Sequence, residues 1–369
     1  MGVNIFFQIM KIGIDGSRAF LEQRTGVEEY SYQVISELRE RLEGHRVRLY
    51  LRSRQTVDFS LPANWQIKKI HCPRLWTQVG LSLELFFHPV DVLFVPAHTA
   101  PLIHPRKTVV TVHGLEYEIM PEAYSAFERF YMRLSIKNSC RWAKKIISVS
   151  KNTKQDLMDL YEVLEEKINL VYEGYEDKAK NLKLAEGGES KNLKPYFLFI
   201  GRLEKRKNIL GIVEAFDLFK KQTGSAHRLV LGGKFGHGGE EIKERIARSD
   251  YAKDILTMGF VADTWKWQLF KNADVFLFPT LYEGFGLPVL EAQSVGVPVI
   301  TSNTSSLPEV ANGSAFLVDP LEPKMIADAM IAITKDEKMA KNLVKKGYEN
   351  IKRFSWKNCA DLIAKALVE

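Results

Sequence analysis

The sequence lacks the residue patterns of a protein held together by disulfide bonds or metal ions. Its 369 residues include three cysteines, Cys72, Cys140 and Cys359, which lie far apart. Its eight histidines form no His-Glu-x-x-His pattern or similar zinc motif. So few cysteines, in an odd number, indicate reduced thiols in a core and a cytoplasmic protein. We therefore expect no disulfide framework, no structural metal and no other cofactor.

Long hydrophobic runs are also absent, which excludes a membrane-spanning helix. The opening segment 3–9 is apolar, but it is short and follows no basic residues, so we expect no secretory signal peptide. Because residues 11–15 already have the pattern of a first strand, either Met1 or Met10 can be the natural start. The composition, 46% hydrophobic and 26% charged, is typical of a soluble globular protein, and the length favours two domains.

Positive charge is in excess and gathers in the first half. The net charge is +7, and residues 39–145 hold 17 Lys and Arg against 9 Asp and Glu. Such an excess indicates nucleic acid, an anionic membrane surface or a lipid-linked substrate as partner, or else plain solvated helix faces. Since the aromatic signatures of RNA-binding sheets are absent, we expect no nucleic-acid partner.

The first half alternates short apolar strands with helices. We expect strands at 12–15, 47–51, 67–72, 92–95, 108–112, 146–149 and 168–171. We expect helices at 27–42, 75–87, 123–143 and 153–160. This alternation predicts an α/β unit with a doubly wound parallel sheet.

The second half repeats the alternation after a segment, residues 173–194, whose Lys, Glu, Gly and Ser content predicts a linker. We expect strands at 196–200, 228–231, 256–259, 275–278, 297–300 and 315–318. We expect helices at 209–221, 240–247, 264–272, 288–295, 323–333, 337–351 and 356–367. Two Rossmann-like halves joined by a hinge predict a cleft, with ligands at the carboxyl ends of the strands.

The stretch 274–303 has the pattern of a strand, a glycine loop, a helix and a second strand. An apolar strand at 275–278 leads into the turn Glu283-Gly-Phe-Gly286. Pro288 suits the first turn of a helix, and Gly296 suits its end. The glycine loop would therefore lie at the amino end of the helix, where free backbone N–H groups bind anions, above all phosphate.

Five residues of this stretch are candidate ligand contacts. The backbone N–H groups of Phe285, Gly286 and Leu287 would face a phosphate at the positive end of the helix dipole. Glu283 on the loop and Glu291 on the helix would point at different parts of one ligand. Two carboxylates suit hydroxyl donors such as sugar and ribose rings. For this motif alone, the alternative is an ordinary helix with a solvated carboxylate at each end.

A second group of candidates follows the strand at 196–200. Gly201 and Arg202 come at its carboxyl end, and Lys207 follows five residues after Arg202 at a helix start. Arginine offers a planar fork to phosphate oxygens and lysine a point charge, so the two would neutralise a diphosphate. Because residues 205–207 are all basic, the alternative is a solvent-exposed basic turn.

The first half offers weaker signals. Gly13 and Gly16 follow the first strand, but the next glycine, Gly26, comes ten residues later, so this is not the dinucleotide fingerprint. Gly26-Val27 stands ahead of a helix, where backbone can approach a ligand. His113 ends the strand at 108–112 and can reach into a cleft, although a lone histidine is as often structural.

Together these motifs resemble retaining glycosyltransferase family 4. The segment from Glu283 to Glu291, with seven residues between its two glutamates, resembles that family's signature. The other motifs stand in the family's order: Gly26-Val27, His113, Ser148-Val-Ser-Lys-Asn-Thr-Lys154, Gly201-Arg202, Lys207-Asn208, Ser302-Asn303 and Leu307-Pro308-Glu309. The resemblance covers nearly the whole chain from Met10 to the last helix.

The resemblance implies a GT-B fold, in which two Rossmann-like domains face each other across a cleft. Residues 1–175, completed by a returning helix at 355–369, would bind the acceptor. Residues 176–354 would bind a nucleoside-diphosphate-sugar donor without a required metal. The triplet Arg24-Thr25-Gly26 departs from the family, because many relatives have a second glycine there.

The resemblance also implies a role for each candidate. Arg202, Lys207, Glu283 and His113 would serve the reaction, and Gly26, Val27, Gly201, Phe285, Gly286, Leu287 and Glu291 would bind the donor. Arg202 and Lys207 would take the diphosphate and stabilise the leaving group in place of a metal. Glu283 would bind sugar hydroxyls rather than act as the nucleophile of a retaining glycosidase.

We therefore expect a retaining glycosyltransferase, with mannose from GDP-mannose as the first guess. The acceptor would be a glycan or a polyprenyl-linked sugar in surface polysaccharide synthesis. One alternative is a nucleotide-sugar epimerase of GT-B fold, which needs paired acid and base groups, yet the sequence shows no clear second base beside His113. The other is a non-catalytic nucleotide-sugar-binding protein, which predicts degenerate phosphate ligands.

The basic first half also suggests peripheral binding to the inner face of the plasma membrane. In an expected helix at 127–145, Arg133, Lys137, Arg141 and Lys144 share one face. Trp65 and Trp76 would add interfacial aromatic rings. Cations near an anionic membrane are worth about 1 kcal/mol each. The alternative is a solvated helix face with buried tryptophans.

Overall fold

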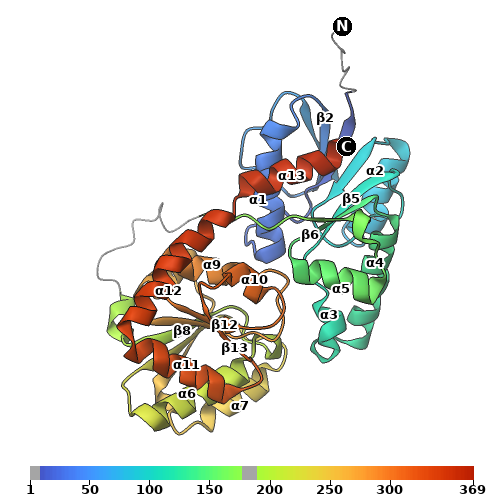
Figure 1. Cartoon of the computed structure of the whole chain (residues 1–369). Helices are drawn as coiled ribbons and strands as arrows, with labels where there is room; N and C mark the ends of the chain where they lie inside the picture. Colours follow the sequence, from blue (N-terminus) through green and yellow to red (C-terminus); the bar gives the residue numbers. More distant parts are fainter. Residues whose placement is uncertain (1–8, 177–188) are drawn as a thin grey trace. The chain divides into compact units, whose positions relative to one another are not determined.

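The computed structural model describes residues 9–176 and 189–369 and divides the chain into two compact units (Figure 1). Unit 1 holds the chain up to Glu118, Ala126–Gly174 and Phe354–Glu369. Unit 2 holds Ile119–Ser125 and Tyr175–Arg353. Most of the expected linker, residues 177–188, and most of the opening apolar segment lie outside the described residues. Each unit is built on one parallel sheet with helices on its faces.

The sheet of unit 1 has seven parallel strands in the order β3-β2-β1-β4-β5-β6-β7. They are β1 Lys11–Asp15, β2 Arg46–Arg52, β3 Trp65–Ile70, β4 Val92–Val95, β5 Lys107–Val112, β6 Lys145–Ser148 and β7 Ile168–Leu170. The central strands are continuous apolar runs because both faces of a parallel sheet are covered. The strand order reverses between β1 and β4, and ligands bind at such switch points in α/β sheets.

Two of the predicted helices before residue 170 differ from expectation, and three short helical segments were not predicted. They are α1 Gly26–Arg41, the π-helix η1 Trp76–Leu81, α2 Ser82–Phe87, α3 Glu116–Ile119, η2 Pro121–Ala123, α4 Ala126–Trp142, α5 Lys151–Tyr161 and η3 Glu165–Lys167. The expected helix 75–87 is split, since its first half is a π-helix preceded by left-handed Leu75. Helix α4 begins late because Tyr124 is extended, and it ends before Lys144, which therefore does not share its cationic face.

Helix α13, Trp356–Val368, follows unit 2 in the chain but packs in unit 1 against α1. The ring of Trp356 lies edge-on to Tyr30, 5.9 Å between centroids, and Arg41 donates to Asp361 at 2.5 Å. Gly174 passes so close that an added Cβ would lie 2.2 Å from the Trp356 backbone nitrogen. The helix is therefore part of the core of unit 1.

Unit 2 has a six-stranded parallel sheet in the order β10-β9-β8-β11-β12-β13. Its strands are β8 Tyr196–Ile200, β9 Arg228–Gly232, β10 Ile255–Gly259, β11 Val275–Phe278, β12 Val299–Ser302 and β13 Phe316–Val318. Strand β12 begins two residues later than expected, after Pro298, which has no N–H to give to a sheet ladder. Stacked rings of Phe199, Phe276 and Phe278 fill the centre of the core.

The helical segments of unit 2 alternate with these strands. They are η5 Glu189–Leu193, η6 Lys205–Lys207, α6 Ile209–Thr223, α7 Gly239–Ala247, η7 Ala252–Asp254, α8 Asp263–Asn272, α9 Leu287–Ser294, α10 Leu307–Ala311, α11 Pro323–Lys335, α12 Glu337–Asn350 and η8 Ile351–Arg353. The short helix α10 was not expected. Two doubly wound parallel sheets confirm the predicted α/β fold class. In the part of the chain that the structure describes, no helix is both long and apolar enough to span a bilayer.

The close approach of Gly174 to α13 gives a test of how the returning helix is held. Replacing Gly174 with Ala should force the Trp356 backbone away and lower the free energy of unfolding by about 1–3 kcal/mol, the usual cost of overpacking. Gly44→Ala is the matched control, because nothing lies within 4 Å of its added Cβ. Denaturant unfolding measures both. Equal midpoints would contradict the proposed packing of α13.

Candidate functional site

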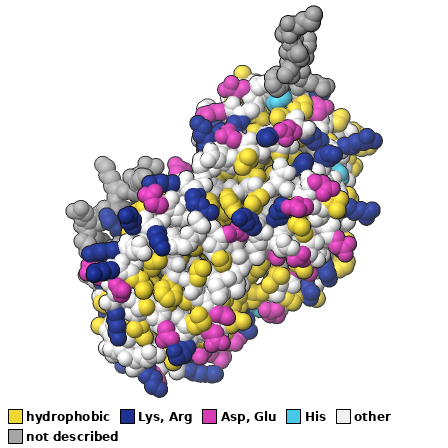
Figure 2. All heavy atoms as spheres, in the orientation of Figure 1, with side chains coloured by type: hydrophobic (Ala, Val, Ile, Leu, Met, Phe, Trp, Pro, Cys, Tyr) yellow, Lys and Arg dark blue, Asp and Glu magenta, His cyan; other side chains and the backbone are white. Residues whose placement is uncertain are grey.

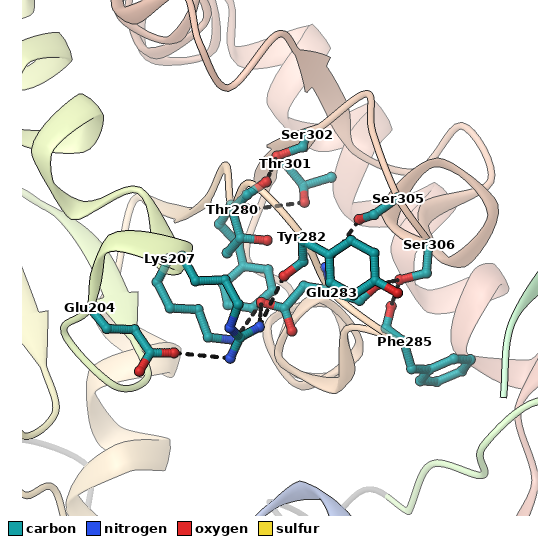
Figure 3. Close-up of polar contacts among 12 residues, drawn as sticks. Glu204, Lys207, Thr280, Tyr282, Glu283, Phe285, Thr301, Ser302, Ser305 and Ser306 are labelled. Atoms are coloured by element: carbon teal, nitrogen blue, oxygen red, sulfur yellow. Dashed lines mark hydrogen bonds and ion pairs between the residues drawn. The ribbon is translucent and has the colours of Figure 1, made fainter. Parts of the chain in front are cut away.

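Two loops meet at the carboxyl end of the unit 2 sheet, where β8 and β11 are neighbours at the switch in strand order. Lys207, at the end of η6, donates from Nζ to the carboxylate of Glu283 on the loop after β11 (Figure 3). Arg206 lies beside it, with Nη1 3.5 Å from Glu283 Oε1. The Arg206 guanidinium also donates to the carbonyl of Tyr282 at 3.0 Å and to Glu204 at 3.0 Å. Two cations, Lys207 and Arg206, thus converge on one carboxylate.

The Lys207–Glu283 pair is largely buried, and burial and the paired charges act on its pKa values in opposite directions. Glu283 is only 8% exposed. Burial acts to raise the pKa of Glu283, but Lys207 and Arg206 together outweigh it, so the pKa lies below the ordinary glutamate value. Burial lowers the pKa of Lys207, against the attraction of Glu283. Breaking a buried pair leaves an uncompensated charge, so the pair holds both loops in place.

Two serines that we did not predict hold the backbone of the glycine loop. Ser306 Oγ lies 2.9 Å from the carbonyl oxygen of Glu283 and 2.7 Å from that of Phe285. The backbone N–H of Glu283 donates to Ser305 Oγ at 3.2 Å. Figure 3 shows both serines beside the loop, just ahead of α10. The only sequence signal for them is their position between the expected strand 297–300 and Leu307.

The glycine loop ends where α9 begins. Gly286 caps α9 with φ +112°, and an added Cβ would lie 2.7 Å from a Leu307 methyl group, so glycine is required there. Phe285 is buried, and Leu287 is the first residue of the helix. These three residues therefore lie at the amino end of α9, where a helix dipole favours an anion.

The other predicted donor residues are more dispersed. Among the described residues, Arg202 makes no ion pair and its side chain is exposed, whereas Arg206 reaches Glu283. Gly201 ends β8 with φ +154°. Glu291 lies on α9 and accepts from Lys266 on α8 at 2.6 Å. A ribose that used Glu291 would therefore meet Lys266 as well.

His113, at the end of β5 in unit 1, has an internal partner for each ring nitrogen. Nε2 lies 2.9 Å from the carbonyl of Pro96, and Nδ1 lies 3.2 Å from the carboxylate of Glu173. Both partners are acceptors, so both contacts are hydrogen bonds only when both nitrogens carry protons. The His98 ring lies 5.3 Å from that of His113. A second imidazole, which our sequence analysis did not identify, therefore lies beside His113.

His98 opens into a small pocket of about 190 Å³ at the switch between β1 and β4. The pocket is lined by Asp15, Ser17, Arg18, Val27, Glu28, Thr77, Ala97, His98 and Thr99. Burial raises the pKa of Asp15 and, with the neighbouring His113, lowers that of His98 to about 3. In the described part of the chain, His98 Nδ1 is buried without a hydrogen-bond partner.

Gly26 and Val27 begin α1 at the rim of this pocket. Thr25 caps the helix and donates to the carboxylate of Glu28, which also lies 3.6 Å from Arg18. No atom lies within 4 Å of a Cβ added to Gly26, so space does not require glycine there. Over residues 9–176 and 189–369, no cluster of three or more His, Cys, Asp or Glu side chains is placed to hold a metal ion.

Both halves of the chain match models of known protein families. Residues 24–178 match the family model described as Glycosyltransferase Family 4, and residues 181–350 match the one described as Glycosyl transferases group 1. The O-antigen chain mannosyltransferase B of Escherichia coli is 30% identical over 270 residues, which cover 69% of this chain and 68% of that protein.

Two further relatives extend the comparison. The serotype-specific mannosyltransferase WbdA of Escherichia coli is 28% identical over 270 residues, but the chain spans only 33% of its length. The crystal structure of Anabaena HepE in complex with UDP and glucose has a TM-score of 0.70 and 17% identity, covering 97% of this chain and 99% of that one. At that identity the likeness shows the fold alone. The family models, the mannosyltransferase and the fold agree: the chain belongs to the glycosyltransferases of GT-B fold.

Proposed function

We propose that this glycosyltransferase moves a hexose, with retention and without a metal, from a nucleoside-diphosphate sugar bound by unit 2. The acceptor is a glycan or a polyprenyl-linked sugar bound by unit 1, in surface polysaccharide synthesis. The observation that carries the proposal is the buried Lys207–Glu283 pair with Arg206 beside it, at the switch point of the unit 2 sheet. A cation and a carboxylate at one point match a ligand that has both phosphate and hydroxyl groups.

The cations are proposed to stabilise the leaving diphosphate. As the bond from the anomeric carbon to the diphosphate breaks, negative charge grows on the phosphate oxygens and positive charge on the sugar ring. Lys207, Arg202 and the amino end of α9 stabilise the negative charge on the phosphate oxygens, and Arg206 adds a further cation. Groups that are fixed before the reaction need no reorganisation, which usually gives the largest share of rate enhancement. This role replaces the metal of other transferases.

Glu283 is proposed to bind sugar hydroxyls rather than attack the anomeric carbon. A carboxylate whose pKa is lowered by Lys207 and Arg206 is a weaker base and a weaker nucleophile than a free one. The acceptor hydroxyl then attacks from the face that the diphosphate leaves. The leaving phosphate oxygen takes the hydroxyl proton, so the products are the retained glycoside and the nucleoside diphosphate. Glu291 takes the ribose hydroxyls, and the N–H groups of Phe285, Gly286 and Leu287 bind the donor.

In unit 1, the pocket beside His98 is proposed to take acceptor hydroxyls. Asp15 and Glu28 can accept hydrogen bonds, and Arg18 can donate them, which is the mixture that a polyol requires. The unpartnered His98 Nδ1 gains a partner when a hydroxyl enters the pocket. Val27 lines this pocket and Gly26 precedes it, and both are proposed to contact the donor. His113 is proposed to touch the transferred sugar.

Mannose is the sugar that the relatives favour. The two curated relatives are named as mannosyltransferases, which supports GDP-mannose as donor. HepE was crystallised with UDP and glucose, so UDP-glucose is the competitor to test. An epimerase remains the rival enzyme, because the imidazole rings of His98 and His113 are neighbours.

Membrane association is proposed on a different surface from the one first expected. Trp65 and Trp76 are buried, so they cannot serve as interfacial rings. Helix α4 instead exposes four apolar side chains at helical spacing: Phe127, Phe130, Tyr131 and Leu134. Cations recur beside them at four-residue steps: Arg129, Arg133, Lys137 and Arg141. Figure 2 shows positive and negative side chains interspersed over the visible face, so charge alone defines no docking surface there.

The donor is identified by a hydrolysis and transfer screen. Mixed with common nucleotide sugars in the presence of EDTA, the protein should release GDP from GDP-mannose and leave UDP-glucose intact. Released nucleoside diphosphate is quantified by chromatography. Conversion of the sugar with no diphosphate release would identify an epimerase, and binding without turnover a non-catalytic protein. Activity that EDTA abolishes and manganese restores would refute metal independence.

Neighbouring cations on the loop after β8 provide a matched test of the site. Lys207→Ala should reduce turnover by about 10²–10³, the typical cost of one lost charge-stabilising contact, and Arg202→Ala should also reduce it. Lys205→Ala is the control, since Lys205 pairs with Glu241 and not with the glycine loop. Steady-state kinetics and thermal unfolding are measured for each variant. Turnover in Lys207→Ala equal to that in Lys205→Ala would exclude the assignment.

Docking through α4 is tested by co-sedimentation with vesicles. Phe127→Ser with Phe130→Ser should weaken binding to phosphatidylglycerol vesicles at low salt while donor hydrolysis stays normal, because α4 lies in unit 1. Leu321→Ser, an equally exposed apolar residue of unit 2, is the control. Binding should also fall at about 1 M salt, where screening is nearly complete. Equal recovery with neutral and anionic vesicles would exclude electrostatic docking.

A further inference from the structure

Unit 1 contains a second, larger cavity, of about 530 Å³, that the transfer reaction does not use. It is lined by Arg106, Lys107, Lys144, Lys145, Asn169, Ala366 and Glu369. Arg106 and Lys107 stand at the amino end of β5, and Lys144 and Lys145 at the amino end of β6. His113 follows the opposite, carboxyl end of β5. The cavity therefore lies at the sheet edge away from the His98 pocket.

We propose that this cavity is a binding site for a phosphate-bearing anion, such as a diphosphate or a phosphorylated sugar. Four cations line it against one acidic residue, Glu369. Its volume falls in the range of small-molecule sites, about 300–1,000 Å³. The Arg106 fork and the lysine ammonium groups are the donors that suit phosphate oxygens, and the Asn169 amide can add a further hydrogen bond.

Strand pairing brings these cations together. The β5–β6 register places Val109 opposite Lys145, and the backbone N–H of Lys144 donates to the carbonyl of Thr108 at 2.8 Å. Two pairs of consecutive basic residues thus start neighbouring strands. The two pairs are offset by two residues in the register, and together they give this sheet edge an excess of positive charge that would attract an anion.

The protein itself offsets only part of this charge. Lys145 donates to the backbone carbonyl of Glu166 at 3.0 Å, which is not an ion pair. Glu369 is shared with Lys365, whose Nζ lies 3.6 Å away. Among the described residues, Arg106, Lys107 and Lys144 have no carboxylate within ion-pair distance. Burial lowers the pKa of Lys107, opposed by Glu369, as expected for a cation that lacks a close counter-charge.

The phosphate has two possible sources with the same chemistry. One is a soluble phosphorylated metabolite, which the volume of about 530 Å³ suits. The other is the headgroup of an anionic lipid, since the loop just before Arg106 exposes Leu102 and Ile103. In both cases the ligand is bound by the same four cations. The two sources predict different binding partners: a lipid headgroup predicts that vesicles bind through the cavity, and a metabolite predicts that only soluble phosphate compounds do.

Inorganic pyrophosphate is the probe, and isothermal titration calorimetry the measurement. Lys207→Ala is the background, so that the proposed donor site contributes little. Pyrophosphate should bind this protein at one site. Adding Arg106→Gln with Lys144→Gln, two exposed side chains, should weaken that binding at least about tenfold, as expected when charged hydrogen bonds are lost. The control is Lys335→Gln with Lys338→Gln, which removes the same charge from exposed positions in unit 2.

Each outcome decides the proposal. Weaker binding in the cavity variant alone supports it. Equal affinity in the cavity and control variants overturns it, as does the absence of binding in the Lys207→Ala background. Lys144→Glu is a second variant, in case the double substitution disturbs the fold. Co-sedimentation with phosphatidylglycerol vesicles separates the sources. If the cavity variant loses vesicle binding as well as pyrophosphate binding, the ligand is a lipid headgroup; if its recovery with vesicles is unchanged, the ligand is soluble. No step requires sugar transfer, so failure of the proposed function would leave this test intact.

Discussion

The buried ion pair between Lys207 and Glu283 is the contact on which the geometry of unit 2 depends. It joins the loop after β8 to the loop after β11, at the position where the strand order reverses. Neither charge could be buried alone, because desolvation would favour its neutral form. Ser305 and Ser306 hold the backbone on one side, and Arg206 adds a second cation on the other. The charges of the candidate site are therefore in position before any ligand binds.

Much of the fold could be predicted because parallel strands have a strong signal. Buried on both faces, runs such as residues 196–200 and 275–278 are continuous apolar segments, and they coincide with β8 and β11. The structure differs from the predicted elements where the backbone conformation of single residues decides where a helix begins or which type it is. Left-handed Leu75 precedes a π-helix, extended Tyr124 delays α4, and the short α10 has too few residues to show a helical period. These depend on tertiary packing, which apolar periodicity does not record.

The site was less predictable, because the sequence does not show in which direction each side chain of a short turn points. Residues 205–207 form a single turn of 3-10 helix, so successive side chains point in different directions, and the sequence cannot tell which face the loop. Arg206 turns inward with Lys207, while Lys205 pairs elsewhere and Arg202 is exposed. His98 could have been found, because it follows β4, whose neighbour β5 carries His113. The roles of the remaining candidates stay predictions.

The placement of α13 has a consequence for synthesis of the protein. A ribosome completes every strand of unit 1 and the whole of unit 2 before it makes Trp356–Val368. Until then, the face of α1 that carries Tyr30 has no helix to cover it. Apart from the short segment Ile119–Ser125, unit 2 is encoded without interruption from Tyr175 to Arg353 and can fold as the nascent chain emerges. Unit 1, although it is begun first, is therefore the last to be finished, and a chain that stops before Trp356 would leave the Tyr30 face of α1 uncovered.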